Sequence, residues 1–376
     1  MRTLTRWLLN FVILRPNVTK YGSPPAPDEQ EITLFGPGYG EAIAIHLGEG
    51  HWILVDSCID PEENEPASQV YLKHCAVNPQ QVRAIVASHW HDDHVKGISR
   101  LAASYPQAEF FLSDVLNTRE SCAYLAAYSG LHTAGLTKGT KELHSVLTAR
   151  GPGATITTLQ RTLVSELSIG GRPVVVRAFS PTPQARAHSV AEFAQYLPTE
   201  EKEQFRDAVD LKPNVGAVVL HVDFGDDAML LGADMEEFKN MGWSSIVNSS
   251  WCNKKTRASV YKVAHHGSET GHNDAVWSVL LKDKDKVTSC LTPFNRGSHR
   301  LPTEQDQARI RRLSGQAFIS SGASKRPQMN SEEHKRLQDI GTNISVLNAG
   351  FGAVRIRRKV GASSWEHELF GDAKPL

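Results

Sequence analysis

Short apolar runs, broken by glycines and polar turns, dominate the first third of the chain and predict β-strands. Three of these runs read I-T-L-F, E-A-I-A-I-H-L and H-W-I-L-V-D, and glycines lie between them. Two stretches with helical character separate the later runs. Strands are therefore predicted at 32–35, 41–47, 51–56, 84–88 and 108–112, and helices at 66–74 and 97–105.

The rest of the chain continues this mixture of strands and helices. Residues 113–170 are mixed in character and residues 184–210 are polar and helical, so both are predicted to be insertions. Strands are predicted at 172–179, 216–224, 228–232, 261–264, 287–292, 317–321, 343–347 and 352–358. This pattern predicts one α/β domain with helices covering two sheets. We expect the domain at 31–360, an N-terminal extension at 1–30 and a C-terminal tail at 361–376.

Composition narrows the classes to which the protein can belong. The chain has 41 Lys and Arg against 41 Asp and Glu, so no overall field attracts it to nucleic acid or to an anionic membrane. Its five cysteines are far apart and form no C-x-x-C pair, which disfavours a disulfide framework and favours a reducing cytoplasm. The apolar residues 7–14 are too short to span a membrane as a helix. No cleavage site follows them, so we interpret them as part of the extension.

Residues 88–94, S-H-W-H-D-D-H, concentrate groups that bind metals or move protons. The predicted strand ends at Ser88, so the side chains that follow share one loop and can converge. His89 and His91 can face one ion, and Asp93 and His94 a neighbouring one. Imidazole and carboxylate suit zinc, and also manganese or iron.

The order H-x-H-x-D-H, followed by Gly97, resembles the signature of the metallo-β-lactamase fold. The resemblance implies an α/β structure, an αββα sandwich in which two mixed sheets pack face to face with helices outside. It also implies a site for two divalent metal ions, with zinc expected first and manganese as the alternative. The implied ligands are His89, His91, Asp93, His94, Asp234 and His265, with Asp56 bracing the loop.

The tandem His265-His266 leaves one assignment open. The resemblance calls for one ligand after this strand, and the sequence does not say which of the two it is. We assign His265 to the metal and His266 to proton transfer, with His299 and His272 as further candidates for the proton donor.

Several other segments resemble the ComEC-like subgroup, the nuclease-type domain of competence DNA-uptake proteins. These are F-G-P-G-Y-G-E-A-I-A-I (35–45), the strand at 215–225, H-H-G-S-E-T-G (265–271) and N-R-G-S-H-R-L-P (295–302). The likeness covers about 32–315 and includes no membrane channel. It implies supporting roles for Ser268, Asn295 and Arg296.

One feature departs from the family pattern. Most enzymes of this fold carry a further histidine that completes the first metal, but residues 177–183 here read R-A-F-S-P-T-P. His188 lies a few residues on and is a weak candidate for that position. Without it, the first metal is left with His89, His91, Asp234 and water, an open site that could accept manganese.

The leading hypothesis is a metal-dependent hydrolase that uses a metal-bound hydroxide, a phosphodiesterase or nuclease acting on DNA or RNA. Asp93 would orient the hydroxide and Asp234 would bridge the ions. Basic runs at 254–257, 309–312 and 355–359 could contact phosphates. The alternatives are a carbon-centred hydrolase (lactonase, thioesterase or β-lactamase-like) and a non-catalytic module that binds a protein partner through the insertions.

Overall fold

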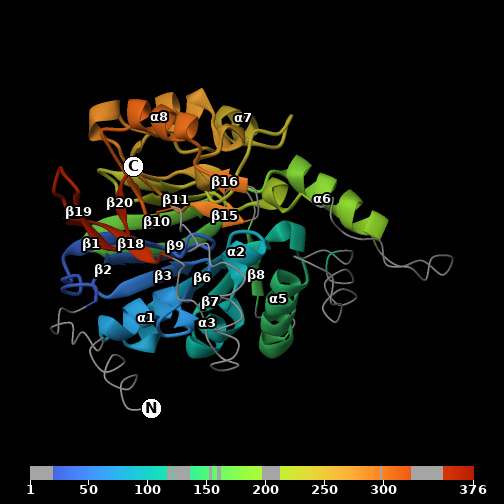
Figure 1. The fold of residues 1–376 in the computed structure, drawn as a ribbon, viewed down its shortest axis with the longest axis horizontal. Helices are drawn as coiled ribbons and strands as arrows, with labels where there is room; N and C mark the ends of the chain where they lie inside the picture. The colour runs from blue at the N-terminus through green and yellow to red at the C-terminus, as the bar shows by residue number, and fades with distance from the viewer. Residues whose placement is uncertain are drawn as a thin grey trace, which may run out of the picture.

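Two eight-stranded sheets form the centre of the molecule, seen here in a computed structural model of the 376-residue chain (Figure 1). The structure describes residues 20–116, 121, 136–151, 155–158, 162–196, 212–296, 299–322 and 350–376. The predicted strand at 343–347 and most of the predicted extension lie outside these residues.

The first sheet has the strand order β19-β18-β1-β2-β3-β6-β7-β8. In its antiparallel half, β1, β2 and β3 form a meander, and β18 and β19 from the C-terminal part of the chain extend it; β3, β6, β7 and β8 run parallel. The strands are β1 (Glu29–Gly36), β2 (Ala42–Gly48), β3 (His51–Val55), β6 (Val82–Ala87), β7 (Glu109–Ser113), β8 (Thr155–Thr158), β18 (Gly352–Lys359) and β19 (Glu366–Gly371).

The second sheet has the order β20-β17-β14-β13-β12-β11-β10-β9, with β12, β13, β14 and β17 parallel. Its strands are β9 (Leu163–Ile169), β10 (Arg172–Ala178), β11 (Leu220–Asp223), β12 (Ala228–Leu231), β13 (Ala258–Lys262), β14 (Thr288–Leu291), β17 (Gln316–Ile319) and β20 (Lys374–Pro375). Two small hairpins complete the strands: β4 (Ile59–Asp60) with β5 (Glu65–Pro66), and β15 (Phe294–Arg296) with β16 (His299–Leu301).

Helices cover the outer faces of both sheets, which gives four layers (Figure 1). On the side of the first sheet lie α1 (Ala67–His74), α3 (Ile98–Ser104) and α5 (Leu136–Arg150), and on the side of the second lie α7 (Trp243–Asn248) and α8 (Glu304–Leu313). The short helix α2 (Asp92–Val95) follows β6, and α6 (Pro183–Tyr196) extends to one side. The predicted αββα sandwich is confirmed.

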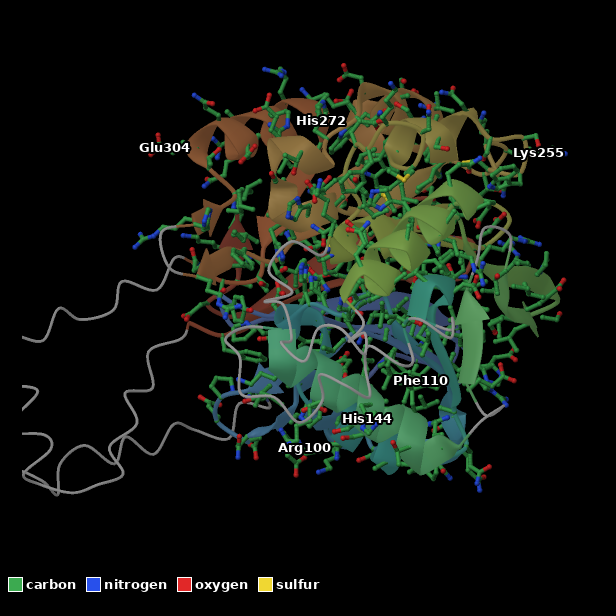
Figure 2. All side chains as sticks on the ribbon, turned by 90° about the vertical axis from the view of Figure 1, so that its right-hand side faces the viewer. Arg100, Phe110, His144, Lys255, His272 and Glu304 are labelled. Carbon is green, nitrogen blue, oxygen red and sulfur yellow. The ribbon has the colours of Figure 1, made fainter. Side chains whose placement is uncertain are left out.

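Three apolar clusters correspond to the three interfaces between these layers. The middle cluster joins the two sheets through residues such as Ile43, Ile53 and Val222. The outer clusters join each sheet to its helices; Phe110 of β7, for example, lies between the first sheet and α5 (Figure 2). Strands buried on both faces read as continuous apolar runs, which is why the sequence pattern located them.

The segment expected to be a C-terminal tail contributes strands instead. Residues 366–371 form β19 at the edge of the first sheet, and 374–375 form β20 at the edge of the second. The stretch 113–170 likewise supplies edge strands β8 and β9. These edges are polar and partly exposed, so they lack the apolar runs by which central strands are found. None of the helices within the described ranges has the length and apolarity to cross a membrane.

Candidate metal centre

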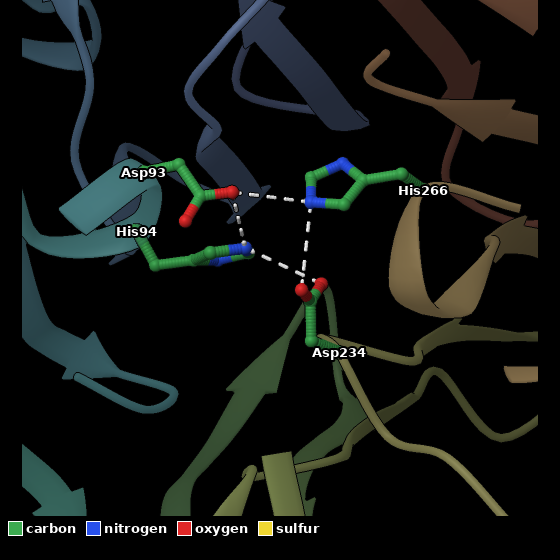
Figure 3. A group of neighbouring side chains, drawn as sticks. All are labelled: Asp93, His94, Asp234 and His266. Carbon is green, nitrogen blue, oxygen red and sulfur yellow. Dashed lines mark ion pairs between the residues drawn. The ribbon is translucent and has the colours of Figure 1, made fainter. Parts of the chain in front are cut away.

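The loops that follow parallel strands of the two sheets meet at one edge of the sandwich. Asp56 follows β3 and Ser88 to His94 follow β6 in the first sheet, while Asp234 follows β12 and the His265-His266 pair follows β13 in the second. The carboxyl ends of parallel strands face the same way, so residues distant in sequence converge there. Figure 3 shows side chains from both sheets pointing at one another.

The backbone of these loops adopts the left-handed region at several residues other than glycine. Positive φ values occur at Asp56 (59°), Ala233 (45°), His265 (46°) and His266 (52°). Such a conformation costs roughly 1–3 kcal/mol per residue and persists only where the surroundings impose it. Its concentration at the strand ends marks this edge as a functional site.

Asp93, His94, Asp234 and His266 form the first ligand group (Figure 3). The Nε2 atom of His266 lies 3.2 Å from Asp93 Oδ2 and 3.4 Å from Asp234 Oδ2. The Nε2 atom of His94 lies 3.3 Å from Asp234 Oδ1 and 3.7 Å from Asp93 Oδ2. All four side chains are buried. Two imidazoles and two carboxylates thus surround one point.

His89, His91 and Asp234 form a second ligand group beside the first. These are the residues that the sequence assigned to the first metal. His89 Nε2 lies 3.1 Å from His91 Nδ1 and 3.9 Å from Asp234 Oδ2. Asp234 therefore belongs to both groups, as a bridging carboxylate would. Within the described residues no further His, Cys, Asp or Glu joins this second group.

The donor atoms of the first group fit a divalent cation. The Nε2 atoms of His94 and His266, Asp93 Oδ2 and Asp234 Oδ1 are buried and have no hydrogen-bond partner among the described residues. Buried polar atoms normally have partners, and an ion would satisfy all four. Imidazole and carboxylate are ligands of zinc and manganese.

The balance of buried charges at this edge also favours a bound cation. Buried carboxylates at Glu41, Asp56, Asp93 and Asp234 line this edge, whereas Lys262 is the buried ammonium that lies with them in the described structure. Buried charges require compensation. Bound cations would supply the missing positive charge.

The pKa values of the histidines show where the surrounding carboxylates stabilise positive charge. Burial opposes a proton on His266, yet Asp234 and Asp93 raise its pKa to about 9. Burial likewise opposes charge on His94, but Asp234, Asp93 and Asp56 raise its pKa well above the ordinary value. For His89 burial prevails and its pKa falls well below the ordinary value. The carboxylates of the first group therefore favour positive charge beside His94 and His266, which is where a bound cation would supply it.

Asp56 holds two of the ligands from behind. Its Oδ2 atom lies 2.7 Å from His94 Nδ1, and it also accepts a 2.7 Å hydrogen bond from Ser88 Oγ. Ser88 Oγ in turn lies 3.0 Å from His89 Nδ1. Protons on both Nδ1 atoms leave each Nε2 lone pair directed toward the centre. This is the bracing role that the sequence assigned to Asp56.

The side chains of the adjacent residues His265 and His266 point in opposite directions. His266 turns inward into the first group, whereas His265 Nδ1 lies 2.9 Å from Thr270 Oγ1 and its Nε2 lies 3.5 Å from Asn214 Nδ2. The sequence-based assignment gave the metal to His265 and proton transfer to His266; the geometry favours the reverse.

The remaining predicted residues lie around the centre or away from it. Ser268 caps the turn after the histidines by accepting from the backbone N–H of Thr270. His299 is exposed on β16, opposite Arg296 in the hairpin, and no described contact joins it to the ligand groups. His188 lies on α6, 3.6 Å from Glu192, outside both ligand groups. The geometry therefore gives no support to His299 as a proton donor or to His188 as a ligand.

His272 is likewise occupied elsewhere. Its Nε2 lies 3.0 Å from Asp274, and its Nδ1 accepts from Trp277 Nε1 at 3.2 Å. Figure 2 labels it near the top of the view, on the outer side of the second sheet.

Three residues of this region were not singled out from the sequence: Glu41, Lys262 and Thr292. Glu41 precedes β2, Lys262 ends β13 and Thr292 follows β14, and all three are fully buried. A charged residue within an otherwise apolar strand, as in Y-K-V-A, is the signal that could have drawn attention to Lys262.

Comparison with known proteins agrees with the site and the fold. The model of the Metallo-beta-lactamase superfamily matches residues 35–110, which span β2, β3, β6 and the ligand loop. Residues 35–110 are therefore similar to the Metallo-beta-lactamase superfamily, and the ligand groups beside them suit a metal-dependent hydrolase. No curated protein sequence gives a significant match.

Solved structures with this fold are similar at low sequence identity. The metallo-beta-lactamase fold protein YhfI from Bacillus subtilis is 13% identical, with a TM-score of 0.39, over 78% of this chain and 96% of YhfI. MEM-A1, a subclass B3 metallo-beta-lactamase from a soil metagenome library, is 15% identical, with a TM-score of 0.33, over 70% of this chain and 90% of MEM-A1. These distant similarities do not bear on the substrate.

Proposed function

We propose that this metallo-beta-lactamase-fold domain is a phosphodiesterase or nuclease with two divalent metal ions, zinc or manganese. The observation that carries the proposal is the pair of adjoining ligand groups that share Asp234. Asp93, His94, Asp234 and His266 would hold one ion, and His89, His91 and Asp234 the other. When bound, such a pair supplies Lewis acidity and lowers the pKa of a bound water, so that hydroxide is available near neutral pH.

A cavity of about 660 Å³ beside the ligand loop favours an anionic substrate. Its cationic lining residues are Lys96, Lys141 and Arg296, and Asn295 adds a buried Nδ2 donor with no partner among the described residues. Arg296 is fixed by a 2.8 Å hydrogen bond to the hydroxyl of Tyr39 and lies over its ring. A planar guanidinium and an amide donor suit phosphate oxygens.

The carboxylates of this cavity are already engaged by backbone donors. Asp92 accepts a 2.8 Å hydrogen bond from the N–H of Gly139, and Glu142 accepts from the N–H groups of Gly97 and Ser99 at 3.1 Å. These bonds hold both side chains in place and leave their charge unchanged, but the three cationic side chains outnumber the two carboxylates, so the lining of the cavity is net positive.

The basic runs expected to contact phosphate lie elsewhere or are paired. Residues 254–257 precede β13 and so lie at the end of that strand opposite His265 and His266. Arg355 and Arg357 form ion pairs with Glu368 and Glu31 behind the first sheet. In 309–312, Arg309 is bound to Asp306. We therefore assign the phosphate contacts to the cavity next to the ligand loop and not to these runs.

His265 is the residue that we propose to transfer a proton to the leaving group. It is partly exposed, adjacent in sequence to His266, and its Nε2 is free of any strong hydrogen bond within the described region. A proton donor must reach both solvent and substrate, which a fully buried ligand such as His266 cannot do.

The order of motifs in this chain supports the nuclease assignment. Three segments resemble the ComEC-like subgroup: 35–45, the H-H-G-S turn and 295–302. The first bonds to Asp93 through the N–H of Glu41 and to Asn295 through the carbonyl of Gly38, and the second contains the candidate ligand His266. DNA or RNA is therefore the proposed natural substrate, and the cytoplasm the proposed location.

Hydrolysis of bis(p-nitrophenyl) phosphate by the metal-loaded protein tests the proposal. Asp93→Ala should abolish turnover and leave the fold intact, and the exposed Asp274→Ala serves as the matched control. Turnover only of lactones or thioesters would instead establish a carbon-centred hydrolase. A metal content near zero in the purified protein would establish a non-catalytic module.

A further inference from the structure

Glu41 is connected to His266 through one hydroxyl group. Thr292 Oγ1 donates a 2.6 Å hydrogen bond to Glu41 Oε2, and His266 Nδ1 lies 3.1 Å from both Oγ1 and the carbonyl oxygen of Thr292. All three residues are at most 1% exposed. The connection is therefore shielded from water along its length.

The donor count in this chain of contacts allows one arrangement of protons. The single hydroxyl hydrogen of Thr292 points to Glu41, so Thr292 offers only acceptors to His266. In the neutral form that can bind a metal, the hydrogen of His266 sits on Nδ1, facing both the carbonyl and the hydroxyl oxygen of Thr292, and the Nε2 lone pair faces Asp93 and Asp234. By accepting the hydroxyl hydrogen, Glu41 keeps Thr292 Oγ1 an acceptor for His266.

Glu41 also reaches the other two sides of the ligand group. Its Oε1 lies 2.6 Å from Lys262 Nζ, which is 3.9 Å from Asp234 Oδ1 and donates a 2.9 Å bond to the carbonyl of Ala233. The backbone N–H of Glu41 donates a 2.8 Å bond to the carbonyl of Asp93. Glu41 therefore has links to three residues of the group, two through its carboxylate and one through its backbone N–H.

The arrangement repeats that of Asp56, Ser88 and His89 on the other side of the centre. In each case a buried carboxylate accepts from a hydroxyl, and the hydroxyl accepts from the Nδ1 of a candidate ligand. One such relay comes from the first sheet alone, while the second joins Glu41 of the first sheet to Thr292 and His266 of the second. It therefore orients the ligands that the second sheet contributes.

We propose that Glu41 and Thr292 are positioning residues for the metal centre, which fix His266 and, through Lys262, Asp234. The inference rests on the metal ions of the proposed function and not on its substrate. Groups that orient metal ligands from behind typically contribute about 10–100-fold in metal affinity or activity.

The packing around Thr292 shows that its place is closely defined. Gly36 lies against it so tightly that an added Cβ would stand 2.6 Å from Thr292 Cγ2. Only glycine allows this approach.

The test compares Thr292→Val, which keeps the shape and removes the hydroxyl, with Thr292→Ser, which keeps the hydroxyl. Affinities for Zn²⁺ and Mn²⁺ are measured on the full chain by competition with a chelating dye. Thr292→Val should weaken binding of the ion assigned to Asp93, His94, Asp234 and His266 by about 10–100-fold, whereas Thr292→Ser should stay within about 3-fold of the wild type. Should Thr292→Val fail to fold, Thr292→Ala takes its place in the comparison.

Asp227 provides a matched control far from the ligands, at the opposite end of β12. It too is a buried carboxylate that accepts from a hydroxyl, Ser259, and pairs with a lysine, Lys282. Ser259→Ala should leave metal affinity unchanged.

The outcomes separate the two proposals. A folded Thr292→Val protein with wild-type metal affinity would overturn the positioning role. A wild-type protein that binds neither metal would instead overturn the proposed function.

Discussion

The Oδ2 atom of Asp56 lies 2.7 Å from the Nδ1 atom of His94, and both side chains are buried. Contact between these two residues, 38 positions apart, directs the Nε2 of His94 toward Asp234. The same carboxylate holds Ser88 through both the N–H and the hydroxyl. One residue at the end of β3 thereby sets the geometry of the whole loop after β6.

Asp56→Asn should weaken metal binding and leave the fold intact. Asparagine tolerates the positive φ of this position, so the backbone can stay in place. An amide has only one acceptor oxygen, so its NH2 group would face either the N–H of Ser88 or the Ser88 hydroxyl and His94, and we expect about a 10–100-fold loss of metal affinity. Dye competition measures the affinity, and circular dichroism checks the fold. Unchanged affinity would show that His94 needs no such support.

His266→Ala and His265→Ala should have different consequences. Loss of His266 removes a candidate ligand, so the protein should retain fewer ions per chain after dialysis. Loss of His265 should leave the metal content unchanged and lower kcat on an oligonucleotide, whose alkoxide leaving group needs a proton, by about 10²–10⁴-fold. On bis(p-nitrophenyl) phosphate kcat should change little, because p-nitrophenolate leaves without a proton. Elemental analysis and kinetics on the same samples distinguish the two. The reverse result would restore the assignment made from the sequence.

Lys141→Ala should raise KM for an oligonucleotide and leave kcat almost unchanged. Lys141 lines the proposed phosphate cavity, and removal of one lysine that pairs with a phosphate should reduce the slope of log affinity against log salt by about 1. Lys255→Ala is the matched control because residues 254–257 lie at the far end of β13. Equal effects of the two substitutions would argue against the cavity.

The stability of the fold should fall in mild acid because of His46 in β2. Burial lowers the pKa of His46 to about 4, and its Nε2 accepts a 3.0 Å hydrogen bond from the N–H of Gly50. The unfolded chain binds this proton near pH 6.5 and the folded chain does not. Stability from neutral His46 is therefore complete above about pH 6.5 and is lost as the pH falls toward 4, by about 2–3 kcal/mol.

Urea unfolding of the wild type and of His46→Gln at about pH 7.5 and about pH 5 measures this contribution. The difference between the two proteins isolates His46 from the histidines of the metal centre, which titrate in both. If the two proteins lose the same stability between these pH values, His46 is not the group responsible.

Local patterns predicted most of the central strands. The apolar runs that became β2, β3, β6 and β7 lie within one or two residues of their expected positions, because strands buried on both faces must be apolar throughout. The edge strands β9 and β19 escaped prediction because their exposed positions carry polar side chains. Their pairing partners, and not their own sequences, make them strands.

Some candidate ligands could likewise be predicted from local sequence, and others could not. Spacing within S-H-W-H-D-D-H was enough to place four of them in one loop, since neighbours in sequence are neighbours in space. The choice between His265 and His266 was not accessible, because it depends on backbone torsions after β13 that local propensity does not set. The proposed roles of Glu41 and Thr292 could not be predicted for a related reason. They depend on a 2.6 Å hydrogen bond between residues far apart in the sequence.

By itself the sequence determined the class of the fold, the concentration of candidate metal ligands in the loop at 88–94 and the order along the chain of the strands that carry their partners. These properties depend on residue type and short-range spacing. Only the tertiary structure decided which side chains turn inward, which carboxylates orient them and which basic groups remain free for a substrate. Those outcomes depend on contacts between two sheets whose strand ends meet, and such contacts are set by packing of the whole chain.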